Sequence, residues 1–280
     1  MTGPPPPGAR LRFAWVNWIL AFVAVSGCAT RQVSFPSDPG ISFSAYEQVF
    51  REATSGCLDV STFIAELSLT GRIDDQGIRG RVQSGFSRPG AVRLEGVAPF
   101  GQPVFILVAR QSDDAVLWLP RESRVVRGPS AAEILEAIAG VALAPDDLSS
   151  VLTGCVVPDP RPLSARLYDN GLVGIALEGD ATVFLARDGN RWRPRMARVS
   201  DWMVDYPVWT GRFPSEVVLR SVSRAIELRV GVSQLQANTP IDQAAFTVTV
   251  PATAQALSLT ELREAGPLGV GTAEDGPRDP

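Results

Sequence analysis

The sequence predicts a mainly β fold with some helix (β+α): a curved antiparallel sheet that forms an unclosed barrel of about ten strands with short lid helices. Most of the chain consists of segments in which apolar and polar residues alternate between turn signals, as in meanders with one buried face. In the middle of the chain this pattern gives way to a helical period, which places short helices across the mouth of the sheet.

The N-terminal residues resemble a secretory signal peptide, because two arginines precede an apolar stretch that ends in small residues. The junction Val25-Ser26-Gly27-Cys28 resembles a bacterial lipobox, in which the cysteine is acylated and becomes the new N-terminus. We therefore expect residues 1–27 to be a lipoprotein signal peptide and Cys28 to be the lipid attachment site. An ordinary signal peptide with a chance cysteine and an uncleaved anchor remain alternatives. Ala29 after the cysteine favours the outer membrane, facing the periplasm.

The elements follow in order along the chain. Residues 28–42 are typical of a tether, 43–265 of one domain, and 266–280 of a disordered Gly/Pro-rich tail. Capping-box sequences predict helices beginning near Ser44, Ser130 and Ser258, the first of them ending near Ser55-Gly56, and Pro145 opens a further short helix. The alternating segments predict strands over 61–73, 78–87, 91–98, 104–109, 115–119, 165–168, 172–177, 182–186, 191–200, 216–221 and 226–232, with a short edge strand over 246–250.

Composition excludes several kinds of chemistry. The formal net charge is −4, and the chain has neither histidine nor lysine. Ser–His–Asp and Cys–His catalysis, imidazole metal sites and Schiff bases are therefore excluded. The carboxylate pairs, such as Asp146-Asp147, lie where Asp is favoured at turns and helix starts. We expect no enzyme, no metal, no cofactor beyond the lipid on Cys28, and no nucleic-acid partner, since no basic stripe is present.

Two cysteines remain after Cys28. In an oxidising compartment, Cys57 and Cys155 are expected to pair, which would close a loop of roughly a hundred residues. Two buried, reduced thiols are the alternative, and the spacing is unlike a zinc or redox motif.

Several segments, taken together, resemble the lipoprotein-localisation receptor LolB and its relatives, of the LolA/LolB type. They include an opening strand, a Pro-Phe-Gly loop in place of the family's Pro-Leu-Gly loop, and a helix–turn–helix with a terminal Leu-Xaa-Gly. They are Leu69-Thr70-Gly71-Arg72-Ile73, Pro99-Phe100-Gly101, and residues 138–154; Asp188-Gly189-Asn190-Arg191-Trp192 and residues 225–232 fit the second half.

The resemblance implies an unclosed barrel that holds acyl chains under a helical lid. The lid residues would be Ile134, Leu135, Ile138, Leu148 and Leu152, on helices with few polar ties to the sheet. Pro99, Phe100 and Gly101 would form an exposed loop that pushes cargo into the bilayer; alternatively, Phe100 is a core residue beside a turn. The implied partners are acylated lipoprotein or lipid cargo, a soluble LolA-like carrier and the membrane.

These observations lead to two hypotheses. The first is an outer-membrane lipoprotein that binds acyl chains in an apolar cavity and acts in lipoprotein or lipid trafficking. The alternative is a structural or assembly lipoprotein of an envelope complex, with a filled barrel and no transfer activity. A core filled with side chains gives the same alternation as a cavity, so the sequence leaves both open.

Overall fold

A computed structural model describes residues 2–3, 35–98, 103–111 and 114–267. The chain divides into two units, Met1–Ser37 and Asp38–Pro280. All the helices and strands of the described residues lie in the second unit, which carries its own core.

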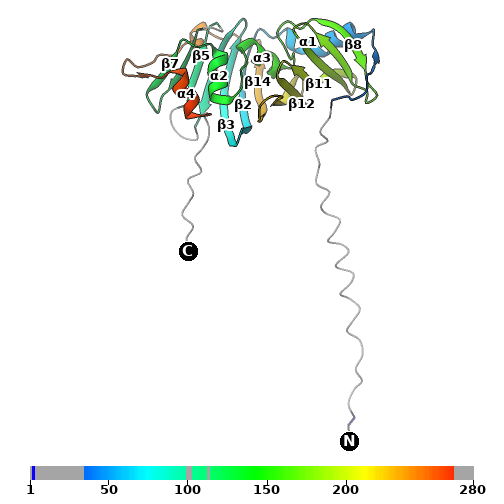
Figure 1. The fold of residues 1–280 in the computed structure, drawn as a ribbon, viewed down its shortest axis with the longest axis horizontal. Helices are drawn as coiled ribbons and strands as arrows, with labels where there is room; N and C mark the ends of the chain where they lie inside the picture. The colour runs from blue at the N-terminus through cyan, green and yellow to red at the C-terminus, as the bar shows by residue number, and fades with distance from the viewer. Residues whose placement is uncertain (1, 4–34, 99–102, 112–113, 268–280) are drawn as a thin grey trace. The chain divides into compact units, whose positions relative to one another are not determined.

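One fifteen-stranded sheet dominates this unit (Figure 1). It consists of two antiparallel meanders that are joined where β14 pairs with β2. The first meander contains β2 (Thr62–Ile73), β3 (Gln76–Ser87), β4 (Ala91–Val97), β5 (Ile106–Ala109), β6 (Ala115–Leu119) and β7 (Arg124–Arg127). The second contains β8 (Pro162–Leu167), β9 (Val173–Leu177), β10 (Ala181–Asp188), β11 (Arg191–Val199), β12 (Trp202–Thr210), β13 (Phe213–Ser221) and β14 (Ile226–Ala237).

The two ends of the sheet do not pair with each other, so the barrel is unclosed. The two-residue strand β1 (Ile41–Ser42) lies beside β8, and β15 (Gln255–Ala256) lies beside β7 in the only parallel pairing among the described strands. A curved, unclosed antiparallel sheet with short helices confirms the predicted fold class. The fifteen strands outnumber the eleven main strands that the alternating segments predict, because β7, β12 and the two edge strands were not predicted.

Helices cover one face of the sheet, here called the inner face. On β14, the buried residues Ile226, Leu228 and Val230 point to this face and alternate with exposed Glu227 and Arg229. Helix α1 (Tyr46–Leu58) packs on β8, β9 and β11, and helix α2 (Ala131–Ala139) packs on β5 and β6. Helix α3 (Pro145–Thr153) packs on β13 and β4, and helix α4 (Leu259–Ala265) lies beside α2. Side chains from the helices and from both meanders form one continuous core.

The first helix differs from its prediction at both ends. Ala45, rather than Ser44, is the N-cap and makes no side-chain capping bond, so the Ser44–Glu47 capping box does not form. The helix also continues through Gly56 to Leu58. Gly56 serves close packing there: a Cβ would lie 3.2 Å from the Arg212 carbonyl oxygen, and the Arg212 guanidinium donates to the Gly56 carbonyl at 2.6 Å. The capping boxes at Ser130 and Ser258 are confirmed.

The predicted edge strand over 246–250 is wrong. Residues Gln243–Phe246 form a 3₁₀ helix, η1, whose start is capped by Asp242 accepting from the Ala244 amide at 2.8 Å. Phe246 is 1% exposed, so its side chain is buried under this turn rather than alternating along a strand.

Candidate functional site

A cavity of about 670 Å³ opens at one end of the second meander. It lies where α3 and the segment after it meet the turns between β9 and β10 and between β11 and β12. Its lining residues are Ala142, Leu143, Asp147, Val151, Val156, Val157, Pro158, Asp159, Pro160, Arg161, Glu178, Gly179, Val199, Ser200, Asp201, Trp202, Val204 and Leu219. The cavity therefore brings together four parts of the chain that are distant in sequence: residues 142–161, 178–179, 199–204 and Leu219.

The cavity is apolar at its base and polar at its rim. Base residues belong to the core and are at most 9% exposed: Leu143, Val151, Val156, Trp202, Val204 and Leu219. Asp159, Arg161, Glu178 and Ser200 at the rim are exposed, so the cavity opens to solvent. This arrangement suits a ligand with an apolar tail and a polar head.

Carboxylates dominate the charge of the rim. Arg161 forms an exposed ion pair with Asp159 at 3.3 Å. Hydrogen bonds from the Ser221 and Ser223 hydroxyls lower the pKa of Asp201, whereas burial, reinforced by neighbouring Asp146, raises the pKa of Asp147. The two carboxylates are thus shifted in opposite directions: hydrogen bonds favour the charged form of Asp201, and burial favours the neutral form of Asp147.

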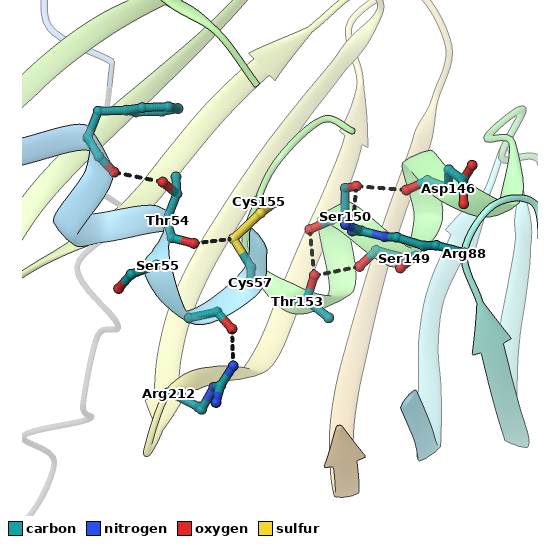
Figure 2. Close-up of a disulfide and its surroundings, with 12 residues drawn as sticks. Thr54, Ser55, Cys57, Arg88, Asp146, Ser149, Ser150, Thr153, Cys155 and Arg212 are labelled. Carbon is teal, nitrogen blue, oxygen red and sulfur yellow. Dashed lines mark hydrogen bonds between the residues drawn. A yellow bond between two sulfur atoms is a disulfide. The ribbon is translucent and has the colours of Figure 1, made fainter. Parts of the chain in front are cut away.

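A disulfide fixes one wall of the cavity (Figure 2). Cys57 at the end of α1 is bonded to Cys155, directly after α3, with a Cα–Cα distance of 5.5 Å. The next residue, Val156, has φ of +72°, and the Val157 amide donates to the Cys155 carbonyl at 2.9 Å. A β-branched residue in this conformation is strained, so the segment that lines the cavity leaves α3 through a tight, costly turn.

The five expected lid residues lie on α2 and α3 and come together over the inner face. Ile134, Leu135, Ile138 and Leu152 are at most 6% exposed, and Leu148 is partly buried against the same core. Their positions agree with an apolar layer beneath the two helices.

The expectation that these helices have few polar ties to the sheet is wrong for α3. Arg88, beside the β3–β4 turn, donates to the Ser150 hydroxyl at 3.1 Å, and Asp146 accepts from the Gly90 amide at 3.0 Å. Figure 2 shows the Arg88 side chain reaching the Ser149–Ser150 stretch of α3. Burial lowers the pKa of Arg88, and its Nε has no hydrogen-bond partner within the part of the chain that the structure describes. Both ties join α3 to the β3–β4 turn, because Ser150 and Asp146 each present a side-chain oxygen that accepts from it.

Cys28, Pro99, Phe100 and Gly101 lie outside the described residues. The strands that flank the Pro-Phe-Gly loop are described: β4 and β5 are antiparallel neighbours, and the Gly96 amide donates to the Phe105 carbonyl at 3.0 Å. The loop thus connects two adjacent strands. Among the described residues, no helix is long and apolar enough to cross a membrane, and no group of three or more Cys, Asp or Glu side chains could hold a metal ion.

Sequence reasoning missed most of the cavity. Asp147 was interpreted as a residue of a helix start, and Trp202 lies on a strand that was not predicted. The proline-rich stretch Val157-Pro158-Asp159-Pro160-Arg161 was the available signal, because prolines prevent regular pairing and keep a segment irregular. The sequence offered no sign that the β9–β10 and β11–β12 turns lie opposite this stretch.

The described residues thus define an unclosed, helix-covered sheet with an amphipathic cavity at one end. No protein-family model matches the chain, and a search of curated proteins finds no match. Similar solved structures include a DUF1329 family protein from Desulfovibrio piger (TM-score 0.47, 11% identity, covering 73% of this chain and 98% of that one).

Two further solved structures are similar over a comparable share of this chain. A LolA superfamily protein from Nitrosomonas europaea has a TM-score of 0.47 and 11% identity, over 72% of this chain and 97% of that one. A putative outer membrane lipoprotein-sorting protein domain from Vibrio parahaemolyticus has a TM-score of 0.41 and 13% identity, over 73% of this chain and 97% of that one. These are similarities between structures, and they assign no function to this chain.

Proposed function

We propose that the protein is an outer-membrane lipoprotein that binds acyl chains and acts in lipoprotein or lipid trafficking. The amphipathic cavity supports this proposal most. Its volume of about 670 Å³ lies within the range of small-molecule sites, and its apolar base continues into the core between the sheet and α3. An acyl tail would enter this base while its polar head stays at the rim.

The energetics of lipid transport fit this role. Three acyl chains exposed to water would cost roughly 30–40 kcal/mol at about 0.8 kcal/mol per methylene, as an upper bound. A protein that moves them therefore needs an apolar site that excludes water and still releases the chain. In the proposal, the segment from Val157 to Arg161, beyond the residues that the disulfide holds, moves to admit the tail.

The resemblance to LolB supports the finer assignment. The helix–turn–helix of that resemblance corresponds to the end of α2, the loop after it and α3, and Leu69–Ile73 lies in β2 beside β14. In this proposal, Cys28 carries the lipid anchor, which palmitate labelling of a Cys28→Ala chain tests, and Phe100 aids delivery to the bilayer. We propose a binding rather than a catalytic role, because the chain lacks histidine and lysine.

The alternative, an assembly lipoprotein with a filled barrel, is favoured by one observation. Inner-face side chains of the sheet are buried in the shared core at 2% exposure or less, including Phe63, Leu107, Leu117, Ile175 and Leu185. On this account the cavity is a surface cleft, and the protein acts by docking a partner.

A binding titration separates the two. The chain from residue 29 onward retains the whole second unit and is titrated with a dansyl-labelled fatty acid. Ala142 is exposed at the cavity, so Ala142→Trp is expected to fill the space and to weaken binding by about tenfold or more. The same change at exposed Ala45, which lies before α1 and outside the cavity lining, should leave affinity unchanged. A wild-type chain that binds no fatty acid would favour the assembly role.

A further inference from the structure

The segment after β14 wraps around one edge of the sheet. Asn238 holds its start, since the Asn238 side chain accepts from the Ser61 amide at 3.0 Å and donates to the Asp59 carbonyl at 2.9 Å. Arg93 then donates to the carbonyls of Ala245 and Thr247 at 2.8 and 3.0 Å. Arg93 alternates with Val92 and Leu94, which face the core, so η1 lies on the outer face of β4.

The same segment then crosses to the inner face. The amides of Gln255 and Leu257 donate to the carbonyls of Ser123 and Val125, both at 2.8 Å, and these bonds place β15 along the edge of β7. Beyond this edge, α4 lies against α2 (Figure 1). We call residues 238–267 the strap.

The strap inserts leucines into the core of the first meander. Leu257 is 6% exposed and Leu262 is 1% exposed, and both belong to the same core as the inner-face residues. The inner-face residues of β5, β6 and β7 and the buried residues of α2 are aliphatic: Leu107, Ala109, Ala115, Leu117, Leu119, Val126, Ala131, Ile134, Leu135, Ala137 and Ile138. Leu257 and Leu262 of the strap therefore fill a groove whose walls are also aliphatic.

Only weak polar contacts hold α4 in this groove. Glu261 pairs with Arg124 at 2.9 Å, and Arg263 pairs with Glu136 at 3.3 Å, with every one of these side chains at least a third exposed. Such exposed pairs contribute little, and a helix of seven residues is unstable by itself. The hydrogen bonds of the strap to β7 end at Leu257, so α4 is held mainly by Leu257 and Leu262.

We propose that the groove beneath α4 is a second acyl-chain site, which the strap masks until a chain displaces the helix. This inference rests on the proposed function and deepens it, because it assigns regulation to the apolar interior. An acyl chain fits the groove because it has no hydrogen-bonding groups along its length, like the side chain of Leu262 that it replaces. The strap remains attached through β15 and Arg93 while α4 swings away.

The test locks α4 in place. Cysteines at Glu136 and Arg263, whose side chains meet at 3.3 Å, are joined with a flexible bis-maleimide in the chain from residue 29, where Cys57 and Cys155 are already bonded. Fatty-acid stoichiometry is measured before and after cross-linking. We expect two sites before and one after, with amide exchange over 257–265 in the unlocked chain at least about tenfold faster when fatty acid is bound.

A second pair of variants tests whether the burial of Leu262 controls the opening of α4. Leu262→Asn should loosen α4 and speed fatty-acid uptake, whereas Thr260→Asn, on the exposed side of the same helix, should not. If Leu262→Asn fails to fold, the cross-linked chain still decides. One site in both the locked and unlocked chains, with unchanged exchange in α4, overturns the masked site and leaves the cavity proposal standing. No binding to either chain overturns both.

Discussion

At the scale of single residues, Gly154 and Gly179 both have a positive φ but differ in the atoms that surround them. Gly154 caps α3 with φ of +89°, and a Cβ there would lie 2.6 Å from the Trp209 ring; Gly179 has φ of +79° with nothing within 4 Å. Gly179→Ala should therefore cost only the backbone penalty of roughly 1–2 kcal/mol. Gly154→Ala should cost about 2–4 kcal/mol, because over-packing adds to it. Equal losses in urea unfolding would contradict this packing.

Asp147 gives the cavity a pH-dependent stability. Burial raises its pKa in the folded state above the ordinary value of 3.8, so the folded chain binds this proton more tightly than the unfolded chain. The stabilisation is fully present below pH 3.8 and is lost as the pH rises through the folded-state pKa. Asp147→Asn should consequently raise the Tm at pH 7 and have little effect at pH 3. Asp75→Asn, in the exposed β2–β3 turn, is the control and should change neither value.

At the scale of elements, the disulfide joins α1 to the end of α3 across 98 residues. Constraining so long a loop in the unfolded chain is worth up to about 4.7 kcal/mol in the chain-entropy account. Replacing both Cys57 and Cys155 with alanine is expected to lower the free energy of unfolding by about 2–5 kcal/mol. An unchanged urea midpoint would mean that native packing of α1 and α3 alone sets the stability.

The same elements show what the sequence could and could not predict. Strand β14 was predicted because its apolar residues alternate without interruption, and the Ser130 and Ser258 caps were predicted because the bonds are local. Strand β12 was missed because Pro207 interrupts its pattern, and its pairing with β13 shifts register beside that residue. The cavity depends on turns that meet through long-range pairing, which no local pattern encodes.

At the scale of the whole described sheet, two meanders share one core through the β14–β2 pairing, and short strands cover both open edges. A sheet that stays unclosed leaves unpaired edge groups exposed, and these are a risk for aggregation. Here β1 and the strap reduce that exposure, while the open end beside α3 keeps the cavity accessible. Access to the cavity is therefore expected beside α3 rather than at the sheet edges.

Quenching of Trp202 tests this claim most directly. Trp202 lines the cavity at 8% exposure, whereas Trp192 lies at the opposite end of β11, beneath the Arg187 guanidinium. The test uses the chain from residue 29 with α4 cross-linked through the substitutions Glu136→Cys and Arg263→Cys, in which the groove beneath α4 stays closed. A brominated fatty acid that enters the cavity should quench the fluorescence of this locked chain. The quenching should largely disappear in Trp202→Phe and persist in Trp192→Phe. Quenching of the locked chain that survives the loss of Trp202 would show that acyl chains bind outside the cavity and would contradict the account.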